Sequence, residues 1–304
     1  MNAPRRVLLL GADGQLGWEL RRALQPIGEV VAAGRAQVDL GDAPRLRECL
    51  RTLQPEVVVN AAAYTAVDRA QSEPDAALRI NAEAPRLLAE HAASTGAWLL
   101  HYSTDYVFDG SAGRPSRESD APNPLGVYGR SKLEGEQAIR ASGCRHLILR
   151  TSWVFAARGE NFARTMVRLA SEREHLRVVA DQVGAPTGAE LIADVSALAL
   201  HRLLREPDLV RGNAGLYHLS SSGSTSWHGY ACHVLRHVAA RGMALRCSAE
   251  QVQAIGSAQY PLPAPRPADS RLDCSALQQW LGVHLPPWQP QVERMLDEAF
   301  GLRA

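Results

Sequence analysis

The chain has 304 residues, of which 46% are hydrophobic and 21% are charged, and its formal net charge is +1. This composition is ordinary for a globular protein with a large core, arranged as one large domain or two. Because 33 Lys plus Arg nearly balance 32 Asp plus Glu, the bulk charge gives no attraction to nucleic acid or to an anionic membrane.

The cysteines and the apolar segments indicate the setting of the protein. Five scattered cysteines contain no C-x-x-C pair, which argues against a disulfide framework and against a thiolate zinc site. No stretch reaches the roughly 18 apolar residues that a membrane span needs, and the short apolar run before Gly11 does not fit a signal peptide. We therefore expect a cytoplasmic protein without a membrane segment.

Short apolar runs alternate with longer amphipathic segments through the first half of the chain. Runs that short and uniformly apolar are typical of strands buried on both faces. They occupy residues 6–11, 29–34, 56–63, 97–104 and 146–152, and helical patterns lie between them at 15–26, 43–53, 73–95 and 127–142. The alternation predicts an α/β fold with a doubly wound parallel sheet of Rossmann type, which binds ligands at the carboxyl ends of its strands.

The pattern becomes less regular after about residue 155. Helical segments are expected at 160–173, 189–205, 227–241 and 288–300. We expect a first domain over residues 1–155 and a smaller α/β part over residues 156–304, with some of the chain returning to the first domain. The proline-rich stretch 260–270 fits a plain surface connection equally well on composition alone.

Three glycines separate the first strand from the first helix. Gly11, Gly14 and Gly17 would let the backbone turn tightly and approach a pyrophosphate, which the helix N-terminus then faces. Glycines also occur in plain turns between a strand and a helix, so the strand and helix around them carry the interpretation. This segment is predicted to bind a dinucleotide.

The end of the second strand bears on which dinucleotide binds. An acidic residue there would hold the ribose hydroxyls of NAD, but the chain has Gly34 and Arg35. A guanidinium can pair with a 2′-phosphate, which favours NADP, although an exposed arginine is often only solvated. Asp39 follows as a candidate for the adenine end.

Polar residues also follow the fourth strand. Ser103 and Thr104 lie at its carboxyl end, where Thr104 could donate a hydrogen bond to a substrate oxygen. Alternatively, the two hydroxyls only cap the strand.

The segment "YGRSKLEGE" contains the only lysine of the chain, Lys132, beside 32 arginines. Tyr128 lies four residues earlier in a helical pattern, so both side chains leave one face about one turn apart. A phenol titrates near pH 10, and a nearby ammonium favours the phenolate that forms when a tyrosine gives up a proton. Seven tyrosines in 304 residues would place one at that offset by chance about 2% of the time, so the pair is interpreted as a functional dyad.

Taken together, these residues resemble the extended short-chain dehydrogenase/reductases. The segments "NAAAYTAVDRAQSEP", "HYSTDYVFDG", "DQVGAPTGAEL" and "RPADSRLD" are similar to the dTDP-4-dehydrorhamnose reductase family within that group. This resemblance implies that NADPH, or less readily NADH, reduces the C4 ketone of dTDP-4-dehydro-β-L-rhamnose, the last step of dTDP-L-rhamnose synthesis for surface polysaccharides. Residues 1–155 would then bind the dinucleotide and residues 156–304 mainly the sugar nucleotide.

The resemblance also implies roles for individual residues. Tyr128 would protonate the developing alkoxide, Lys132 would lower the Tyr128 pKa and hold the nicotinamide ribose, and Thr104 would polarise the substrate. The cofactor would contact Gly11, Gly14, Gln15, Leu16, Gly17, Arg35, Asp39, Leu40, Ala63, Tyr64, Thr65, Tyr128 and Lys132. The sugar nucleotide would contact Thr104, Asp105, Tyr106, Trp153, Asn161, Asp181, Gln182 and Arg266, the last as a partner of a phosphate oxygen.

Some relatives hold a magnesium ion at a homodimer interface through glutamates, and the matching positions are Glu19, Glu190 and Glu298. Two other function classes stay open. A catalytically silent regulatory subunit with a dinucleotide fold would not need the dyad, and a dehydratase or epimerase acting on another nucleotide sugar would need further acid/base groups such as Asp105.

Overall fold

The computed structural model describes residues 4–205 and 215–302. Its central sheet has six parallel strands in the order β10-β5-β4-β3-β1-β2. The strands are β1 Arg6–Leu10, β2 Glu29–Ala33, β3 Val57–Asn60, β4 Trp98–Thr104, β5 Arg145–Thr151 and β10 Leu216–His218. The five strands predicted in the first half are confirmed. The strand order reverses between β1 and β3, so the doubly wound sheet is confirmed too.

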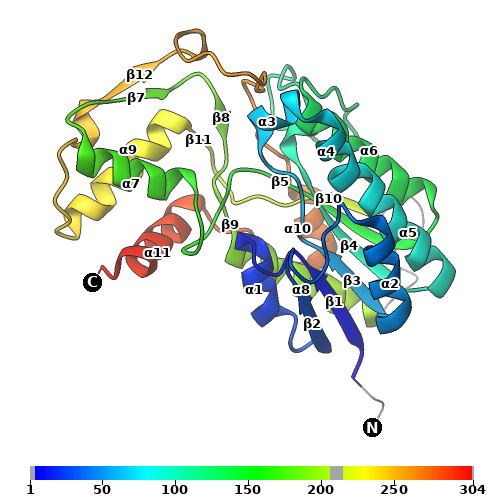
Figure 1. Ribbon diagram of the computed structural model, residues 1–304. Helices are drawn as coiled ribbons and strands as arrows, with labels where there is room; N and C mark the ends of the chain where they lie inside the picture. Colours follow the sequence, from blue (N-terminus) through cyan, green and yellow to red (C-terminus); the bar gives the residue numbers. More distant parts are fainter. Residues whose placement is uncertain (1–3, 206–214, 303–304) are drawn as a thin grey trace.

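The strands are apolar on both faces because helices cover both (Figure 1). Val7 and Leu9 of β1 pack into one core, and Leu8 and Leu10 pack into the opposite one, all at 0–1% exposure. Burying each such side chain stabilises the fold by about 1.5–3 kcal/mol. The first face carries α1 Gln15–Ala23, α8 Ala189–Arg205 and α10 Ser275–Leu281, and the second carries α2 Ala43–Leu53, α5 Ala84–Thr95 and α6 Val127–Ala141.

The single helix predicted over 73–95 is interrupted. The structure has α4 Pro74–Leu78, the π-helical turn η1 Arg79–Glu83 and then α5. Pro85 has no N–H for the carbonyl oxygen of Asn81, four residues earlier, which accounts for the wider turn. The sequence also gave no prediction for α3 Val67–Ser72, a short helix directly before α4.

The remaining helices lie to one side of the sheet in Figure 1 and form their own apolar core. They are α7 Phe162–Glu172, α9 Trp227–Ala240 and α11 Trp288–Phe300, and with α8 they agree with the four helices predicted there. The short strands nearby are β6 Val154–Phe155, β7 Leu176–Val179, β8 Val183–Gly184, β9 Thr187–Gly188, β11 Thr225–Ser226 and β12 Val252–Ile255. No helix of the described part of the chain is long and apolar enough to cross a bilayer.

Residues beyond 155 contribute to the main sheet and its helices as well as to the separate core of α7, α9 and α11. Helix α8 packs against α1, and β10 pairs with β5 at the edge of the main sheet. The boundary at residue 155 stays a prediction.

Candidate active site

The glycine turn has the geometry that the sequence predicts. Gly11 adopts φ +77°, and a Cβ there would lie 2.6 Å from the Ala62 nitrogen, so only glycine fits. Gly14 is the N-cap residue of α1, and a Cβ on Gly17 would lie 2.0 Å from the Gly11 carbonyl oxygen. The backbone is therefore open for an anion in front of the helix N-terminus, at the switch point between β1 and β3.

A cleft of about 420 Å³ runs from this turn along the carboxyl ends of the strands. Its lining includes the predicted residues Gly11, Gly14, Gln15, Leu16, Arg35, Asp39, Leu40, Ala63, Thr65, Tyr128 and Lys132. Gly17 lies beneath the turn. Tyr64 does not line the cleft, and its hydroxyl donates to Glu73 over 2.5 Å.

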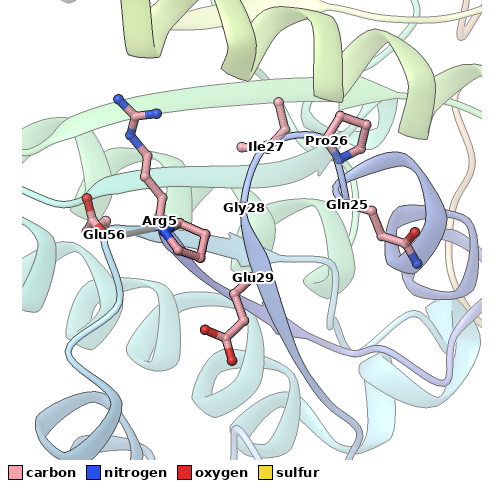
Figure 2. A pocket seen from close by; sticks show the side chains of 8 residues that line it. Arg5, Gln25, Pro26, Ile27, Gly28, Glu29 and Glu56 are labelled. Atoms are coloured by element: carbon pink, nitrogen blue, oxygen red, sulfur yellow. The ribbon is translucent and has the colours of Figure 1, made fainter. Parts of the chain in front are cut away.

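A hollow of about 620 Å³ lies at the opposite edge of the sheet (Figure 2). Arg5, Gln25, Glu29 and Glu56 line it, around the amino ends of β1 and β2. Ligands of doubly wound sheets bind at the carboxyl ends of the strands, so this hollow is not the candidate site.

The Tyr128 and Thr104 side chains lie close together at the end of β4, near enough for the Thr104 hydroxyl to act on the pKa of Tyr128. The Thr104 hydroxyl also donates to Asp105 Oδ1 over 3.0 Å and accepts from the Tyr106 backbone N–H over 3.2 Å. Thr104 is 4% exposed, and α6 places Tyr128 at the cleft. Two hydroxyls thus stand together where a carbonyl oxygen could accept from both.

Lys132 lies one turn further along α6 and is 2% exposed. Its Nζ donates to the Tyr102 carbonyl oxygen over 2.6 Å and lies 3.3 Å from His101 Nε2. Asn60 Oδ1 accepts from the Ala62 N–H, so Asn60 Nδ2 faces His101 Nδ1 at 3.1 Å as a donor. The neutral imidazole then carries its proton on Nε2, facing the lysine.

Burial lowers the pKa of Lys132 to about 8, and Glu136 opposes that shift. The pKa of His101 lies well below its usual value because of burial and the Lys132 charge, so His101 is neutral near pH 7. Lys132 therefore stays an ammonium at neutral pH and loses its proton at mildly alkaline pH.

A buried ion pair continues the same polar layer beneath α6. Arg150 on β5 donates to Glu136 Oε1 over 2.9 Å and to Oε2 over 2.6 Å, and both side chains are at most 2% exposed. Next to Arg150, His218 on β10 is fully buried, and burial lowers its pKa to about 3. Glu136 is therefore one carboxylate beside two buried cations, Lys132 and Arg150.

The expected lowering of the Tyr128 pKa by Lys132 is not found. Burial raises that pKa to about 12, the nearby Thr104 hydroxyl opposes the shift, and the Asp105 charge adds to it. The Lys132 ammonium is turned instead toward the Tyr102 carbonyl oxygen and the His101 ring. Tyr128 is consequently a neutral phenol that holds its proton at neutral pH.

Two of the predicted substrate residues, Asp105 and Tyr106, lie around this pair, and a third, Trp153, packs against the core of α7, α9 and α11. Burial raises the pKa of Asp105 to about 7, and Asp105 Oδ2 has no hydrogen-bond partner among the described residues. The Tyr106 ring meets the Tyr128 ring edge to face, with centroids 5.5 Å apart. Trp153 has the left-handed φ of +46° and stacks on Trp227 at 3.5 Å, which the sequence did not predict.

The residues predicted at the nucleotide end are less uniformly placed. Asn161 caps α7 and donates to Gln15 Oε1 over 3.2 Å, so it lies next to a predicted cofactor residue. The Ser257 hydroxyl donates to Asp181 and accepts from the Gln182 side-chain amide. Arg266 forms an ion pair with Asp68 at 2.8 Å.

Arg35 lies on the cleft with its side chain 82% exposed and pairs with Asp39 at 3.2 Å. Asp39 also accepts from the Gly41 N–H over 2.8 Å, and this bond, followed by the Arg35 pair, lowers the Asp39 pKa. The exposed guanidinium is free to turn toward another anion.

The three glutamates predicted to hold magnesium do not form a binding set. Glu19, Glu190 and Glu298 lie near one another, since burial and then the charges of Glu190 and Glu298 raise the Glu19 pKa. Glu190 is paired with Arg294 at 3.3 Å, however. Within residues 4–205 and 215–302, no group of three His, Cys, Asp or Glu side chains could hold a metal ion. The magnesium site at a homodimer interface therefore stays a prediction.

The predictions from the sequence did not include Asn60, His101, Glu136, Arg150 and Asp68. A polar residue inside an apolar strand is a usable signal, since "VVVN" and "WLLHYST" place Asn60 and His101 in register on β3 and β4. Asp68 and its partner Arg266 are 198 residues apart and carry no such signal.

Residues 5–300 match the family described as RmlD substrate binding domain. The chain is 48% identical to the dTDP-4-dehydrorhamnose reductase of Escherichia coli (strain K12), over 97% of this chain and 98% of that one. It is 46% identical to the Salmonella typhimurium enzyme of the same name, with equal coverage. The crystal structure of the Bacillus anthracis dTDP-4-dehydrorhamnose reductase in complex with NADP superposes with a TM-score of 0.86 at 32% identity, covering 97% of this chain and 99% of that one.

Proposed function

This chain belongs to the dTDP-4-dehydrorhamnose reductase family, and we propose that it reduces the C4 ketone of dTDP-4-dehydro-β-L-rhamnose with hydride from NADPH, or less readily from NADH. The reaction is the last step of dTDP-L-rhamnose synthesis, and its product supplies polysaccharide assembly. The observation that carries the site assignment is Tyr128 at the cleft with the Thr104 hydroxyl next to it and the buried Lys132 one turn away on the same helix.

Tyr128 is the proton donor in this proposal. NADPH, when bound, supplies the hydride that reaches C4 of the sugar. The C4–O double bond becomes a single bond, and the Tyr128 hydroxyl gives its proton to the resulting oxygen. A pKa of about 12 keeps the phenol protonated before the reaction, which is the form that a reduction requires.

Thr104 and Lys132 support that transfer. Thr104 is positioned to donate to the same sugar oxygen, which stabilises the charge that develops on it. Lys132 lines the same cleft one turn further along α6, where its ammonium would hold the nicotinamide ribose hydroxyls. The glycine turn would hold the pyrophosphate, and Arg35 would pair with the 2′-phosphate.

We also propose a cytoplasmic homodimer. All five cysteines are free thiols, which suits a reducing compartment. Trp18 on α1 and Leu198 on α8 are 40% and 53% exposed on two helices that pack together, and such apolar surface favours a partner copy. Light scattering behind a sizing column tests the dimer, and a monomeric mass at micromolar protein would rule it out.

Mixing the protein with dTDP-4-dehydro-β-L-rhamnose and NADPH tests the activity, followed at the nicotinamide absorbance band. We expect Tyr128→Phe to lower kcat on the order of 10²-fold or more. Tyr217→Phe is the matched control, since it removes a hydroxyl from β10, away from the cleft. No NADPH oxidation by the unmodified protein would overturn the reductase. Full activity of Tyr128→Phe would overturn its role as the donor and favour another acid, such as Asp105.

A further inference from the structure

The proline-rich loop 260–270 is fastened to the sheet half of the molecule through one carboxylate. Asp68 on α3 accepts from Arg266 Nη1 over 3.1 Å, from Arg266 Nη2 over 2.8 Å and from the Ala264 backbone N–H over 3.1 Å. Arg266 Nη1 also donates to the Ala264 carbonyl oxygen over 2.9 Å. One side chain therefore holds both the backbone and the cation of a distant loop.

This contact lies beside the candidate catalytic residues. Asp68 follows the predicted cofactor residues Ala63, Tyr64 and Thr65 by a few positions. The Arg266 and Tyr106 side chains lie close enough to affect each other's pKa, and the Tyr106 ring meets the Tyr128 ring edge to face. The loop is thus docked next to the tyrosine that would donate the proton.

The geometry leaves Arg266 with capacity for a second anion. Asp68 binds the end of the planar guanidinium through Nη1 and Nη2, so the edge formed by Nε remains for another acceptor. The Arg266 side chain is 17% exposed, so its neighbours restrict its orientation while solvent and ligands can still reach it. Arg266 lowers the pKa of Asp68, and both groups stay charged at neutral pH.

We infer that Asp68 is a positioning residue for substrate binding: it holds Arg266 beside Tyr106 so that the guanidinium meets the diphosphate of the sugar nucleotide. The inference rests on the proposed function and deepens it. A loop with four prolines between residues 260 and 270 and exposed Tyr260 and Leu262 would otherwise order its arginine only when the ligand arrives. Fixing the cation in advance improves affinity, because less conformational entropy is lost on binding.

The test measures binding by calorimetry with two probes, dTDP and thymidine, the second of which lacks the diphosphate. We expect Asp68→Asn to weaken dTDP binding about tenfold, the effect of one charged contact of about 1.4 kcal/mol, and to leave thymidine binding unchanged. In turnover, KM for the sugar nucleotide should rise by a similar factor, with kcat and the KM for NADPH nearly unchanged.

Asp120→Asn is the matched control. Asp120 also binds both Nη atoms of an arginine, Arg114, and a backbone N–H, that of Arg117, but all within its own loop. We expect dTDP binding by that variant to equal that of the unmodified protein.

The double variant decides whether Asp68 acts through Arg266. Arg266→Ala should weaken dTDP binding more than Asp68→Asn, and adding Asp68→Asn to it should change nothing further. Unchanged dTDP affinity in Asp68→Asn, additive losses in the double variant, or an equal loss for thymidine would each overturn the inference. If the unmodified protein bound no dTDP and oxidised no NADPH, the proposed function itself would fail, which is a different result.

Discussion

Lys132 Nζ lies 2.6 Å from the Tyr102 carbonyl oxygen, with 2% of the side chain exposed. The contact spans from α6 to β4 and fixes the position of the only lysine in the chain. On its other side the ammonium lies 3.3 Å from Nε2 of the His101 ring. This buried position therefore has room only for a compact cation.

We therefore expect the Lys132→Arg variant to be much less active than the unmodified protein, although it keeps the charge. A guanidinium is larger and planar, so its insertion should cost about 1–3 kcal/mol of folding free energy and lower kcat at least tenfold. Arg130→Lys, the reverse exchange at an exposed position of the same helix, is the control and should be neutral. Near-normal activity of Lys132→Arg would refute this account of the lone lysine.

The activity should fall at alkaline pH. Burial lowers the pKa of Lys132 to about 8, so the ammonium is present below that pH and is lost as the pH rises through it. A kcat profile with NADPH should show an alkaline midpoint near 8. Because Glu136 raises the Lys132 pKa, Glu136→Gln should move that midpoint to lower pH. Glu134→Gln, exposed on the same helix, should leave it in place. An unmoved midpoint in Glu136→Gln would contradict the electrostatic link.

The Arg150–Glu136 pair should matter strongly for stability. Arg150→Met leaves a buried carboxylate without its cation and should cost about 3–5 kcal/mol of unfolding free energy in urea titrations. Adding Glu136→Leu should recover most of that loss, since an apolar pair no longer needs charge compensation. Arg51→Met breaks an exposed pair with Glu48 and should cost at most about 1 kcal/mol. A small effect of Arg150→Met would mean that water reaches the pair.

Arg35 should set the cofactor preference. We expect a lower KM for NADPH than for NADH, and Arg35→Ala should raise the KM for NADPH about tenfold, near 1.4 kcal/mol, while leaving NADH unaffected. Arg51→Ala, on the outer surface of α2, is the control. Equal KM values for the two cofactors in the unmodified protein would rule this prediction out.

Chelation should have no effect. Because Glu190 pairs with Arg294 and no metal-binding set forms in the described part of the chain, EDTA should change neither the turnover rate nor the mass in solution. Restoration of lost activity by magnesium, but not by calcium, would show that the glutamates converge on an ion after all.

The local features were readable from the sequence because their causes are local. Buried parallel strands must be apolar on both faces, which marked β1 and β3 to β5, and the turn at Gly11 needs a positive φ that glycine provides. The spacing of Tyr128 and Lys132 placed both on one face of α6. The π-helical turn before Pro85 was missed, because a helical hydrophobic pattern continues through it.

Only the tertiary structure determined the contacts between distant segments and the pKa values that depend on those contacts. The sequence indicated that Lys132 acts on Tyr128, but the folded chain turns the ammonium to Tyr102 and His101, and burial raises the pKa of Tyr128 instead. Likewise, the sequence offered Arg266 as a phosphate partner, and the fold added Asp68 to hold it. Desolvation and ion pairing depend on which segments pack together in the folded chain, and no local sequence pattern specifies that packing.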